Sequence, residues 1–401
     1  MRGEKLLVFN NLFIINMNKC NLLIAGDYHI YGRFNEFILR NPDHKLFKNE
    51  LLEKISGYDK RIFNLEDPIT DSRNGCIKSG PYGVGSERCL DAIDSAEFQI
   101  ATFSTNHTYD MKNQGIIDTI AICKKHNIDI IGAGLTPQEA GTPYVLEING
   151  IKITLLNYAR IEFNCVNNQH GGANPLNTIN NYREIKLTKK YSDFVIVIVH
   201  DGVDVFNLPY PDLVNKMRFY AEAGADAIIL HHSQMFSGFE IYRNVPIFYG
   251  IGNLLHLTQM PYDKTGYMIG LSFEKGNPIK FEIIPIQLDD KDISVNILND
   301  KEKEIILDKI NELSNVITSP ELLKNEWLKH ISNIRVSYLS SLFMLPPLFY
   351  KILKKLKLLN TLEHILLLNK KRLLPILNLI RCDTHREAVI AYLEGIFYEE
   401  G

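Results

Sequence analysis

Residue types that bind metal ions stand at the ends of five short apolar runs in this sequence. The runs and their polar residues are "NLLIAGDYH" with Asp27 and His29, "RIFNLEDP" with Glu66, "FQIATFSTNH" with Asn106 and His107, "DFVIVIVHDG" with His200, and "ADAIILHHSQ" with His232. Carboxylate and amide oxygens mixed with imidazole nitrogens form the ligand set of hydrolytic divalent-metal sites. A divalent ion lowers the pKa of bound water towards neutrality and so supplies hydroxide for attack on a phosphoryl or acyl centre.

Each of these residues also has an ordinary structural explanation. Asp27 follows a glycine and fits a turn, Glu66 fits a loop charge, and His200 fits a buried histidine with satisfied hydrogen bonds. Asn106 precedes a helical pattern and fits a helix N-cap. The joint occurrence favours a metal site, with Asn106 as a ligand and His107 as the proton donor to a leaving group.

The elements that must position these residues alternate between strands and helices. Segments 115–127 and 211–225 carry apolar residues at helical spacing, and the second stops at Gly224, a favourable C-cap. From about residue 142 the pattern changes, because "YVLEINGIKITLLNY" and later segments up to about residue 288 predict antiparallel hairpins. The sequence therefore predicts two packed sheets with helices outside, and ligands of such sheets collect beyond the carboxyl ends of strands.

The region after residue 300 has a different character, because strand patterns vanish there. We expect one domain over residues 20–290, folding independently, and a helical region over 300–401. Residues 351–381 hold eight Lys or Arg residues against one acid. Apolar and lysine-rich faces in segment 345–381 are typical of helices at a membrane surface. The alternative is a helical subdomain with solvated lysines, and Pro375 interrupts the run.

Composition excludes several other classes of protein. The 44 Lys and Arg residues balance 47 Asp and Glu residues, so no general nucleic-acid-binding charge is present. The six cysteines lack metal-binding spacing and predict reduced thiols of a cytoplasmic protein, with peripheral membrane association as a further option. The N-terminal "MRGEKLLVFNNLFIINMNKC" is a weak signal peptide, and translation starting at Met17 is an alternative. No apolar run is long enough to predict a membrane span.

Five motifs, in order, resemble CapA-type capsule-synthesis proteins. They are "GDYHIYGRF", "FNLEDPIT", "STNHTYDMKNQGIIDTIAICKKHNIDIIGAGLTPQEA", "VIVHDGVDV" and "AGADAIILHHSQMFSGFEIYRNVPIFYGIGNLL", within residues 20–275. That family is associated with poly-γ-glutamate and is a branch of the calcineurin-like metallophosphoesterases. The resemblance implies an α/β, four-layer αββα sandwich with a metal centre at the strand ends.

The resemblance also implies roles for individual residues. Its motifs place metal ligands at Asp27, Glu66, Asn106, His200 and His232, and an acidic residue at Asp204 that joins His107 as a catalytic candidate. His29 is a further expected ligand. Adjacent strand residues point to opposite faces, so we expect only one of His231 and His232 to reach the site, and the His-x-His spacing of the family selects His232. Three departures are notable: Asp201 replaces a tryptophan, Gln234 stands at a usual histidine position, and His29 forms an Asp-x-His pattern that resembles the wider phosphoesterase superfamily.

These observations lead to two hypotheses about function. The first is a capsule or poly-γ-glutamate biosynthesis protein with one or two Mn, Zn or Fe ions, which hydrolyses a phosphoester or a γ-glutamyl bond. Its substrate would be a polyanionic or phosphorylated polymer, or a small phosphorylated molecule. The second is a polymer-handling or scaffold subunit with a degenerate metal site, which Gln234 and Asp201 favour because they remove expected site residues.

Overall fold

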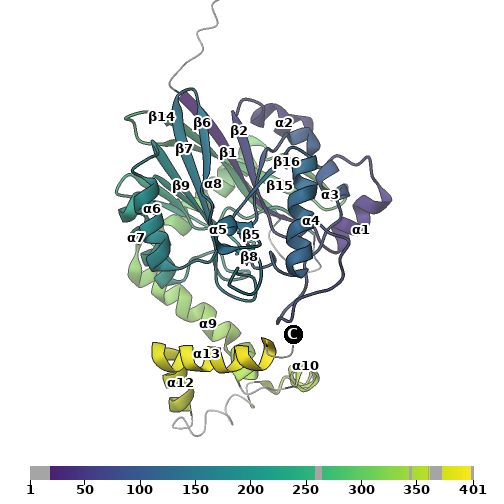
Figure 1. Cartoon of the computed structure of the whole chain (residues 1–401), viewed down its shortest axis with the longest axis vertical. Coiled ribbons are helices and arrows are strands. Elements are labelled where there is room, and N and C mark those ends of the chain that lie inside the picture. The colour runs from purple at the N-terminus through teal and green to yellow at the C-terminus, as the bar shows by residue number, and fades with distance from the viewer. Residues whose placement is uncertain (1–18, 258–263, 343–345, 360, 362–372, 399–401) are drawn as a thin grey trace, which may run out of the picture. The chain divides into compact units, whose positions relative to one another are not determined.

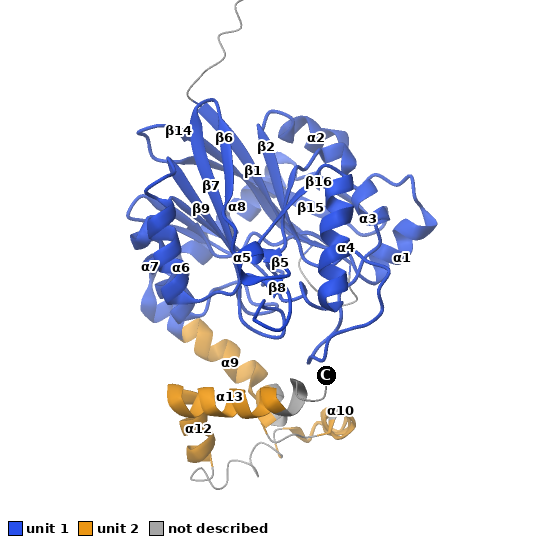
Figure 2. Ribbon diagram, viewed as in Figure 1, with its two compact units in different colours: residues 1–324 blue, residues 325–401 orange. Residues whose placement is uncertain are grey.

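The computed structural model describes residues 19–257, 264–342, 346–359, 361 and 373–398 (Figure 1). The chain divides into two compact units, residues 1–324 and residues 325–401, which are coloured separately in Figure 2. The first unit contains every site residue predicted from the sequence.

The larger sheet of the first unit has eight strands among the described residues. In spatial order they are β16 (Ser294–Ile297), β15 (Lys280–Asp289), β14 (Thr265–Glu274), β1 (Lys19–His29), β2 (Lys60–Leu65), β3 (Ile100–Thr102) and β4 (Asp129–Ile131), with β13 (Asn253–His256) paired to β1. Strands β1 to β4 and β13 run parallel, whereas β14 to β16 add an antiparallel extension.

The second sheet has six strands and is also mixed. Its order is β11 (Phe239–Tyr242), β12 (Val245–Phe248), β10 (Ala227–His231), β9 (Phe194–His200), β7 (Ile151–Ala159) and β6 (Tyr144–Ile148), and a small separate sheet pairs β5 (Ala133–Gly134) with β8 (Gly172–Ala173). The predicted hairpin at Asn149 and Gly150 is confirmed, because β6 and β7 pair antiparallel and both turn residues have positive φ.

Burial on both faces explains why the two sheets stack between helices. In β1, Leu23 and Ala25 belong to the core shared with the helices, and Leu22 and Ile24 on the opposite face are equally buried. Between the sheets, the rings of Phe194 and Phe273 pack 5.2 Å apart. Helices flank this pair of sheets on both sides (Figure 1), which confirms the predicted four-layer arrangement.

The helices of the first unit fall into two groups by position. Those beside the larger sheet are α1 (Arg33–Arg40), α2 (Asn49–Ile55), α3 (Arg88–Asp91) with a 3-10 turn (Asp94–Ala96), and α4 (Lys112–Lys125). Those beside the smaller sheet are α6 (Thr178–Thr188) and α7 (Pro211–Ala223), while the short α5 (Pro137–Ala140) follows β5. Tyr158 of β7 contacts Tyr220 of α7, which places α7 on the outer face of the smaller sheet.

Parallel strands from both sheets end at one place. His29 closes β1, Glu66 follows β2, and His200 and His231 close β9 and β10. The two sheets meet there, because Asn64 Nδ2 of β2 lies 3.3 Å from His200 Nδ1 of β9. The sandwich therefore brings together polar residues that are far apart in the sequence, as predicted from the positions of the strand ends.

Gly26 allows β1 to pass close to the chain that precedes β13. A Cβ added at Gly26 would lie 2.1 Å from the Gly252 carbonyl oxygen, far inside packing distance. We expect Gly26→Ala to lower the free energy of unfolding by about 2 kcal/mol or more, because backbone rather than a flexible side chain must move. Urea denaturation measures this change, and Gly57→Ala is the control, since an added Cβ there meets no atom within 4 Å. An equal loss in both variants would contradict the explanation.

Helix α8 (Asp300–Thr318) belongs to the first unit. Its Ser314 Oγ accepts a hydrogen bond of 2.9 Å from the backbone N–H of Phe239 in β11. The remaining helices among the described residues are α9 (Pro320–Leu342), α10 (Pro347–Lys355), α12 (Leu374–Arg381) and α13 (Asp383–Tyr398). The described residues of these segments are helical, whereas the division into residues 20–290 and 300–401 and the independent folding of the first stay predictions.

Two sequence expectations about the whole chain can be compared with the structure. No helix in the described parts of the chain combines the length and the hydrophobicity that a membrane crossing requires. All six cysteines are described, and they are free thiols. Residues 360 and 362–372, which include part of the predicted basic segment, lie outside the described residues.

Candidate metal centre

Three buried side chains point potential ligand atoms at one another where the sheets meet. Ligand atoms of Glu66, His200 and His232 all lie within 4.8 Å of one another. His200 Nε2 is 2.9 Å from Asn106 Oδ1 and 3.2 Å from His232 Nδ1. Two ligands of a tetrahedral zinc site, each about 2.0–2.1 Å from the ion, lie about 3.3 Å apart. Glu66, Asn106, His200 and His232 therefore form a donor set of the right spacing, which we call the four-ligand cluster.

The burial of this cluster without a compensating positive charge suits a cation. Glu66 Oε2 is buried and accepts no hydrogen bond from any described residue. Burial raises the pKa of the Glu66 carboxyl well above its usual value, which is the mark of a buried charge that lacks compensation. Burial also lowers the pKa of His200 and of His232 well below the usual value. Both imidazoles are thus neutral at pH 7, the form that binds metal ions, and the residues present fit a divalent ion.

Local backbone structure explains how each ligand reaches the cluster. His200 is the last residue of β9, and Glu66 directly follows β2. Asn106 lies in the loop between β3 and α4, and it does not cap α4, whose N-cap residue is Met111. The helix-cap explanation of Asn106 is therefore wrong, because Asn106 lies well before the first turn of the helix.

His231 and His232 both contact site residues, so the expectation that only one of them reaches the site is wrong. His231 ends β10, and its Nδ1 lies 2.9 Å from Asp27 Oδ1. His232 lies just beyond the strand with φ of 97°. Strand alternation no longer applies to a residue in that conformation. The second histidine consequently turns towards His200 instead of pointing away from it.

Asp27 lies at the site but is held by protein groups. Its Oδ1 accepts a 2.9 Å hydrogen bond from Asn64 Nδ2 and contacts His231, and its Oδ2 accepts a 3.0 Å bond from the backbone N–H of His232. Burial raises the pKa of the Asp27 carboxyl, but the hydrogen bond and charge of His231 outweigh this and bring it below the usual value. Asp27 therefore fixes the His231–His232 turn, and its role as a ligand stays a prediction.

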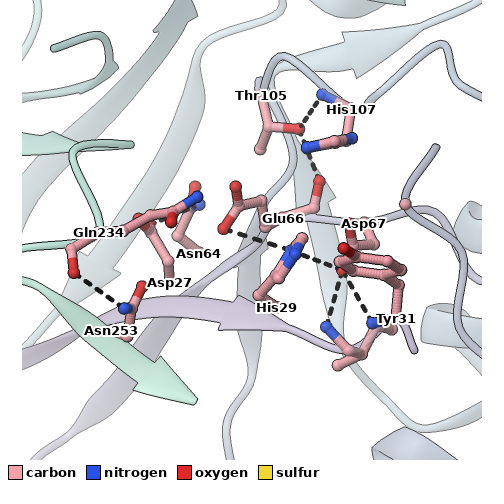
Figure 3. A network of polar contacts seen from close by, with 12 residues as sticks. Asp27, His29, Tyr31, Asn64, Glu66, Asp67, Thr105, His107, Gln234 and Asn253 are labelled. Carbon is pink, nitrogen blue, oxygen red and sulfur yellow. Dashed lines mark hydrogen bonds and ion pairs between the residues drawn. The ribbon is translucent and has the colours of Figure 1, made fainter. Parts of the chain in front are cut away.

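His29 is oriented by a carboxylate that sequence reasoning missed. Its Nδ1 lies 2.9 Å from Asp67 Oδ2 and 3.6 Å from Glu66 Oε2 (Figure 3). Burial raises the pKa of the Asp67 carboxyl, but the charge of His29 lowers it by more. The pKa of this carboxyl therefore falls to about 2. A carboxylate on one ring nitrogen is the usual partner of a metal-binding histidine, because it orients the ring and leaves the other nitrogen available. This contact supports His29 as a ligand but does not test it.

Gln234 and Asp201 occupy two of the positions that depart from the resemblance. Gln234 Oε1 is buried without a hydrogen-bond donor among the described residues, while the backbone carbonyl of Gln234 accepts a 3.0 Å bond from Asn253 Nδ2 (Figure 3). Asp201 accepts hydrogen bonds from the Gly202 N–H and the Tyr210 hydroxyl, at 2.8 and 2.9 Å. Gln234 thus presents an unused oxygen, whereas the Asp201 carboxylate is taken up by its neighbours.

A cleft of about 860 Å³ is lined by His29, Asn106, His107, Gln234 and Asp204, among other residues. His107 Nδ1 lies 2.7 Å from Asp110 Oδ2, and the same carboxylate pairs with Lys78. Asp204 Oδ1 lies 3.2 Å from His232 Nε2, and the Asp204 side chain is 60% exposed. Both predicted catalytic residues therefore border the cleft, which also contains the predicted ligands Asn106 and His29.

Several functional candidates were missed from the sequence, and they share one property. Each acts by holding another site residue: Asn64 on Asp27, Asp67 on His29, and Asp110 on His107. Asp67 follows Glu66 directly and Asp110 stands three residues after His107, so proximity to a motif was the available signal. Asn64 stands two residues before Glu66 in the same motif, but a polar residue inside a buried strand gives no indication of which residue it contacts.

Two relatives of this chain are capsule biosynthesis proteins of bacilli. PGA biosynthesis protein CapA of Bacillus subtilis (strain 168) is 25% identical over 231 residues, which cover 56% of this chain and 60% of that protein. Capsule biosynthesis protein CapA of Bacillus anthracis is 24% identical over 279 residues, covering 67% of this chain and 68% of that protein. The chain thus aligns with somewhat less than two thirds of the first relative and slightly more than two thirds of the second.

Solved structures with partial similarity include a hypothetical protein from Thermus thermophilus, with a TM-score of 0.41 and 14% identity over 67% of this chain and 99% of that chain. The calcineurin-like phosphoesterase YfkN of Bacillus subtilis aligns with a TM-score of 0.38 and 12% identity, over 77% of this chain and 98% of that chain. The family model of the bacterial capsule synthesis protein PGA_cap matches residues 21–257, which include the whole four-ligand cluster. The chain belongs to the bacterial capsule synthesis protein PGA_cap family.

Proposed function

We propose that this chain is a divalent-metal-dependent hydrolase of capsular polymer metabolism, with its metal held by Glu66, Asn106, His200 and His232. The observation that carries the proposal is the convergence of these ligand atoms around the buried Glu66, His200 and His232, with Glu66 Oε2 lacking any hydrogen-bond donor among the described residues. A bound divalent ion supplies a hydroxide at neutral pH and polarises the bond under attack. The remaining steps fall to residues around the cleft.

His107 is the proposed proton donor to the leaving group. Its Nδ1 is hydrogen-bonded to Asp110, which leaves Nε2 as the nitrogen that exchanges a proton with substrate in the cleft. A second carboxylate, Asp204, borders the same cleft beside His232. Its proposed role is to accept the proton that the attacking water loses. The tautomer of His107 is thus set by Asp110, as in other histidine and aspartate pairs that transfer protons.

The proposed substrate is a phosphoester or a γ-glutamyl bond of an anionic polymer or of a small phosphorylated molecule. The cleft is bordered by the cationic residues Arg33, Lys78 and Arg160, which can meet anionic groups of a substrate. Lys78 and Arg160 are themselves paired with Asp110 and Glu162. We therefore expect substrate recognition to depend on where a substrate carries its negative charges rather than on its total negative charge. Its volume of about 860 Å³ admits a small molecule or one segment of a polymer.

The test of this function is a hydrolysis screen on the full chain loaded with Mn, Zn or Fe. The substrates are aryl phosphomonoesters, aryl phosphodiesters and γ-glutamyl peptides. We expect turnover of one class that requires added metal and falls about 100-fold or more in His107→Gln, because a general acid contributes that much. Metal-dependent turnover that is unchanged in His107→Gln would remove the proposed role of this residue.

A second candidate function is polymer handling without turnover. The observation that favours it is the Asp27 carboxylate, which already accepts hydrogen bonds from Asn64 and from the His232 N–H and contacts His231, so protein groups use part of its capacity to bind an ion. On this alternative the protein would retain metal and bind poly-γ-glutamate without hydrolysing any substrate in the screen. Binding of the polymer, measured by calorimetry alongside the screen, distinguishes the two functions.

Gln234→His tests how many ions the site holds. An amide oxygen is a weaker ligand for zinc or manganese than an imidazole, so we expect the wild-type chain to retain one ion firmly and a second weakly or not at all. Gln234→His should raise the retained metal towards two ions per chain, measured by inductively coupled plasma mass spectrometry after dialysis. Gln138→His, at an exposed position on α5, is the control for an added histidine. Two ions already present in the wild type, with no change in Gln234→His, would show that Gln234 does not limit metal binding.

A further inference from the structure

Helix α10 presents an apolar stripe that no described residue covers. Leu348, Phe349, Ile352 and Leu356 are 71%, 45%, 46% and 59% exposed. Residues three and four apart lie on the same face of a helix, so these four side chains form one continuous strip. Leu353, by contrast, is 9% exposed. The helix thus has one buried apolar position and, beside it, an apolar strip that remains exposed.

Four lysines accompany this strip. Lys351, Lys354 and Lys355 lie on α10 and Lys357 follows its end, and all four are exposed. None of them forms an ion pair with a described residue, whereas several lysines of the first unit have a carboxylate nearby. By helical spacing, Lys351 and Lys355 lie along one edge of the apolar strip. Apolar residues bordered by cations are the composition of helices that lie in the plane of an anionic membrane surface.

We propose that α10 docks this chain on an anionic lipid surface, with the strip of Leu348, Phe349, Ile352 and Leu356 entering the headgroup region. Lys351 and Lys355 then meet lipid phosphates, and their methylene stems lie along the interface while the ammonium groups stay hydrated. This proposal is independent of the proposed hydrolase activity, because it rests on residues of the second unit alone.

Charge decides between a lipid surface and a second copy of the chain as the occupant. Two copies meeting through α10 in a symmetric dimer would bring the same lysines close together. The exposed acidic side chains needed to neutralise them are absent from α10, whose sequence is "PLFYKILKK". An anionic bilayer instead supplies negative charge along the whole helix, so it compensates the lysines at the edge of the strip at once.

The test is co-sedimentation of the full chain with vesicles of phosphatidylglycerol and phosphatidylcholine, compared with phosphatidylcholine alone. We expect binding to the anionic vesicles that weakens when salt rises from about 0.05 M to about 0.5 M. Lys351→Glu/Lys355→Glu should weaken binding by about 25-fold or more, at about fivefold for each lysine near the surface. Leu348→Ser/Ile352→Ser should weaken it by about tenfold or more, because two apolar side chains no longer enter the interface.

The control for charge is Lys301→Glu/Lys303→Glu, which makes the same change in net charge at exposed positions of α8. It should retain wild-type binding, and circular dichroism should be equal for all variants because the replaced side chains are exposed. No binding at low salt, equal binding to neutral vesicles, or equal losses in the α8 variant would overturn the proposal. Self-association that both α10 variants abolish, in the absence of vesicle binding, would assign the strip to a second copy instead.

Discussion

Replacing His232 with alanine should strip the purified protein of its divalent metal. The side chain is buried between His200 and Asp204, and its loss removes one of four donors from a site that also needs it to hold His200 in place. Removing a residue that only orients a metal ligand lowers metal affinity by about 10- to 100-fold. Removing a ligand itself should therefore lower metal affinity by more than about 100-fold. Dialysis against a weak chelator followed by metal analysis measures the change.

The control for this prediction is His126→Asn. His126 is a largely buried histidine beside Asp91 and Asp94, which form the other group of candidate ligands among the described residues. If the metal is bound at the four-ligand cluster, His126→Asn retains it and His232→Ala loses it. The reverse pattern would mean that the ion is held beside α3 and α4, and the proposed site would then be wrong.

Asp110→Asn should lower kcat by about 100- to 1,000-fold while leaving the metal in place. The Asp110 carboxylate accepts from His107 Nδ1 at 2.7 Å and from the Gly83 N–H at 2.6 Å, and it pairs with Lys78. An amide at this position can present its NH₂ to the histidine and so stabilise the wrong tautomer, which is costly for a proton-transferring imidazole. Steady-state kinetics on the substrate identified in the hydrolysis screen, with metal content measured in parallel, give the two readouts.

Loss of a buried carboxylate can also destabilise a protein without any effect on chemistry. Glu240→Gln is the matched control, because Glu240 is buried and paired with Arg218 away from the cleft, at 2.8 Å. We expect Glu240→Gln to lower the free energy of unfolding and to keep kcat within about twofold when assayed below its melting temperature. A loss of kcat in Asp110→Asn no larger than in Glu240→Gln would assign Asp110 a purely structural role.

The sandwich and most of the site could be predicted because they follow from local patterns. Buried strands ending in polar residues indicated where parallel strands meet, and Asn149 with Gly150 indicated a hairpin that the structure confirms. Glu66, Asn106, His200 and His232 were named from these ends and converge in the fold. Pattern reasoning succeeds here because the carboxyl ends of neighbouring parallel strands must lie at the same edge.

Backbone conformation beyond the strands and contacts across the fold could not be predicted. The left-handed φ of His232 places it against His200, and alternation along a strand cannot anticipate such a residue. Asn64 and Asp67 act on Asp27 and His29 through contacts between β1, β2 and the loops after them, so their roles depend on register. Helix α8 contacts β11 of the first unit through Ser314. The sequence changes from strand to helix patterns near residue 300, so we assigned α8 to the C-terminal region instead.

Anomalous X-ray diffraction from crystals of the full chain grown with Mn²⁺ tests the metal site most directly. Collected on both sides of the manganese absorption edge, the data locate the ion without any assumption about its ligands. We predict an anomalous peak within coordination distance of Glu66 and His232, about 2.0–2.3 Å from their nearest ligand atoms. A crystal with manganese only at Asp91, Asp94 and His126, or with no ordered peak at manganese concentrations that support turnover, would contradict the four-ligand cluster as the metal centre.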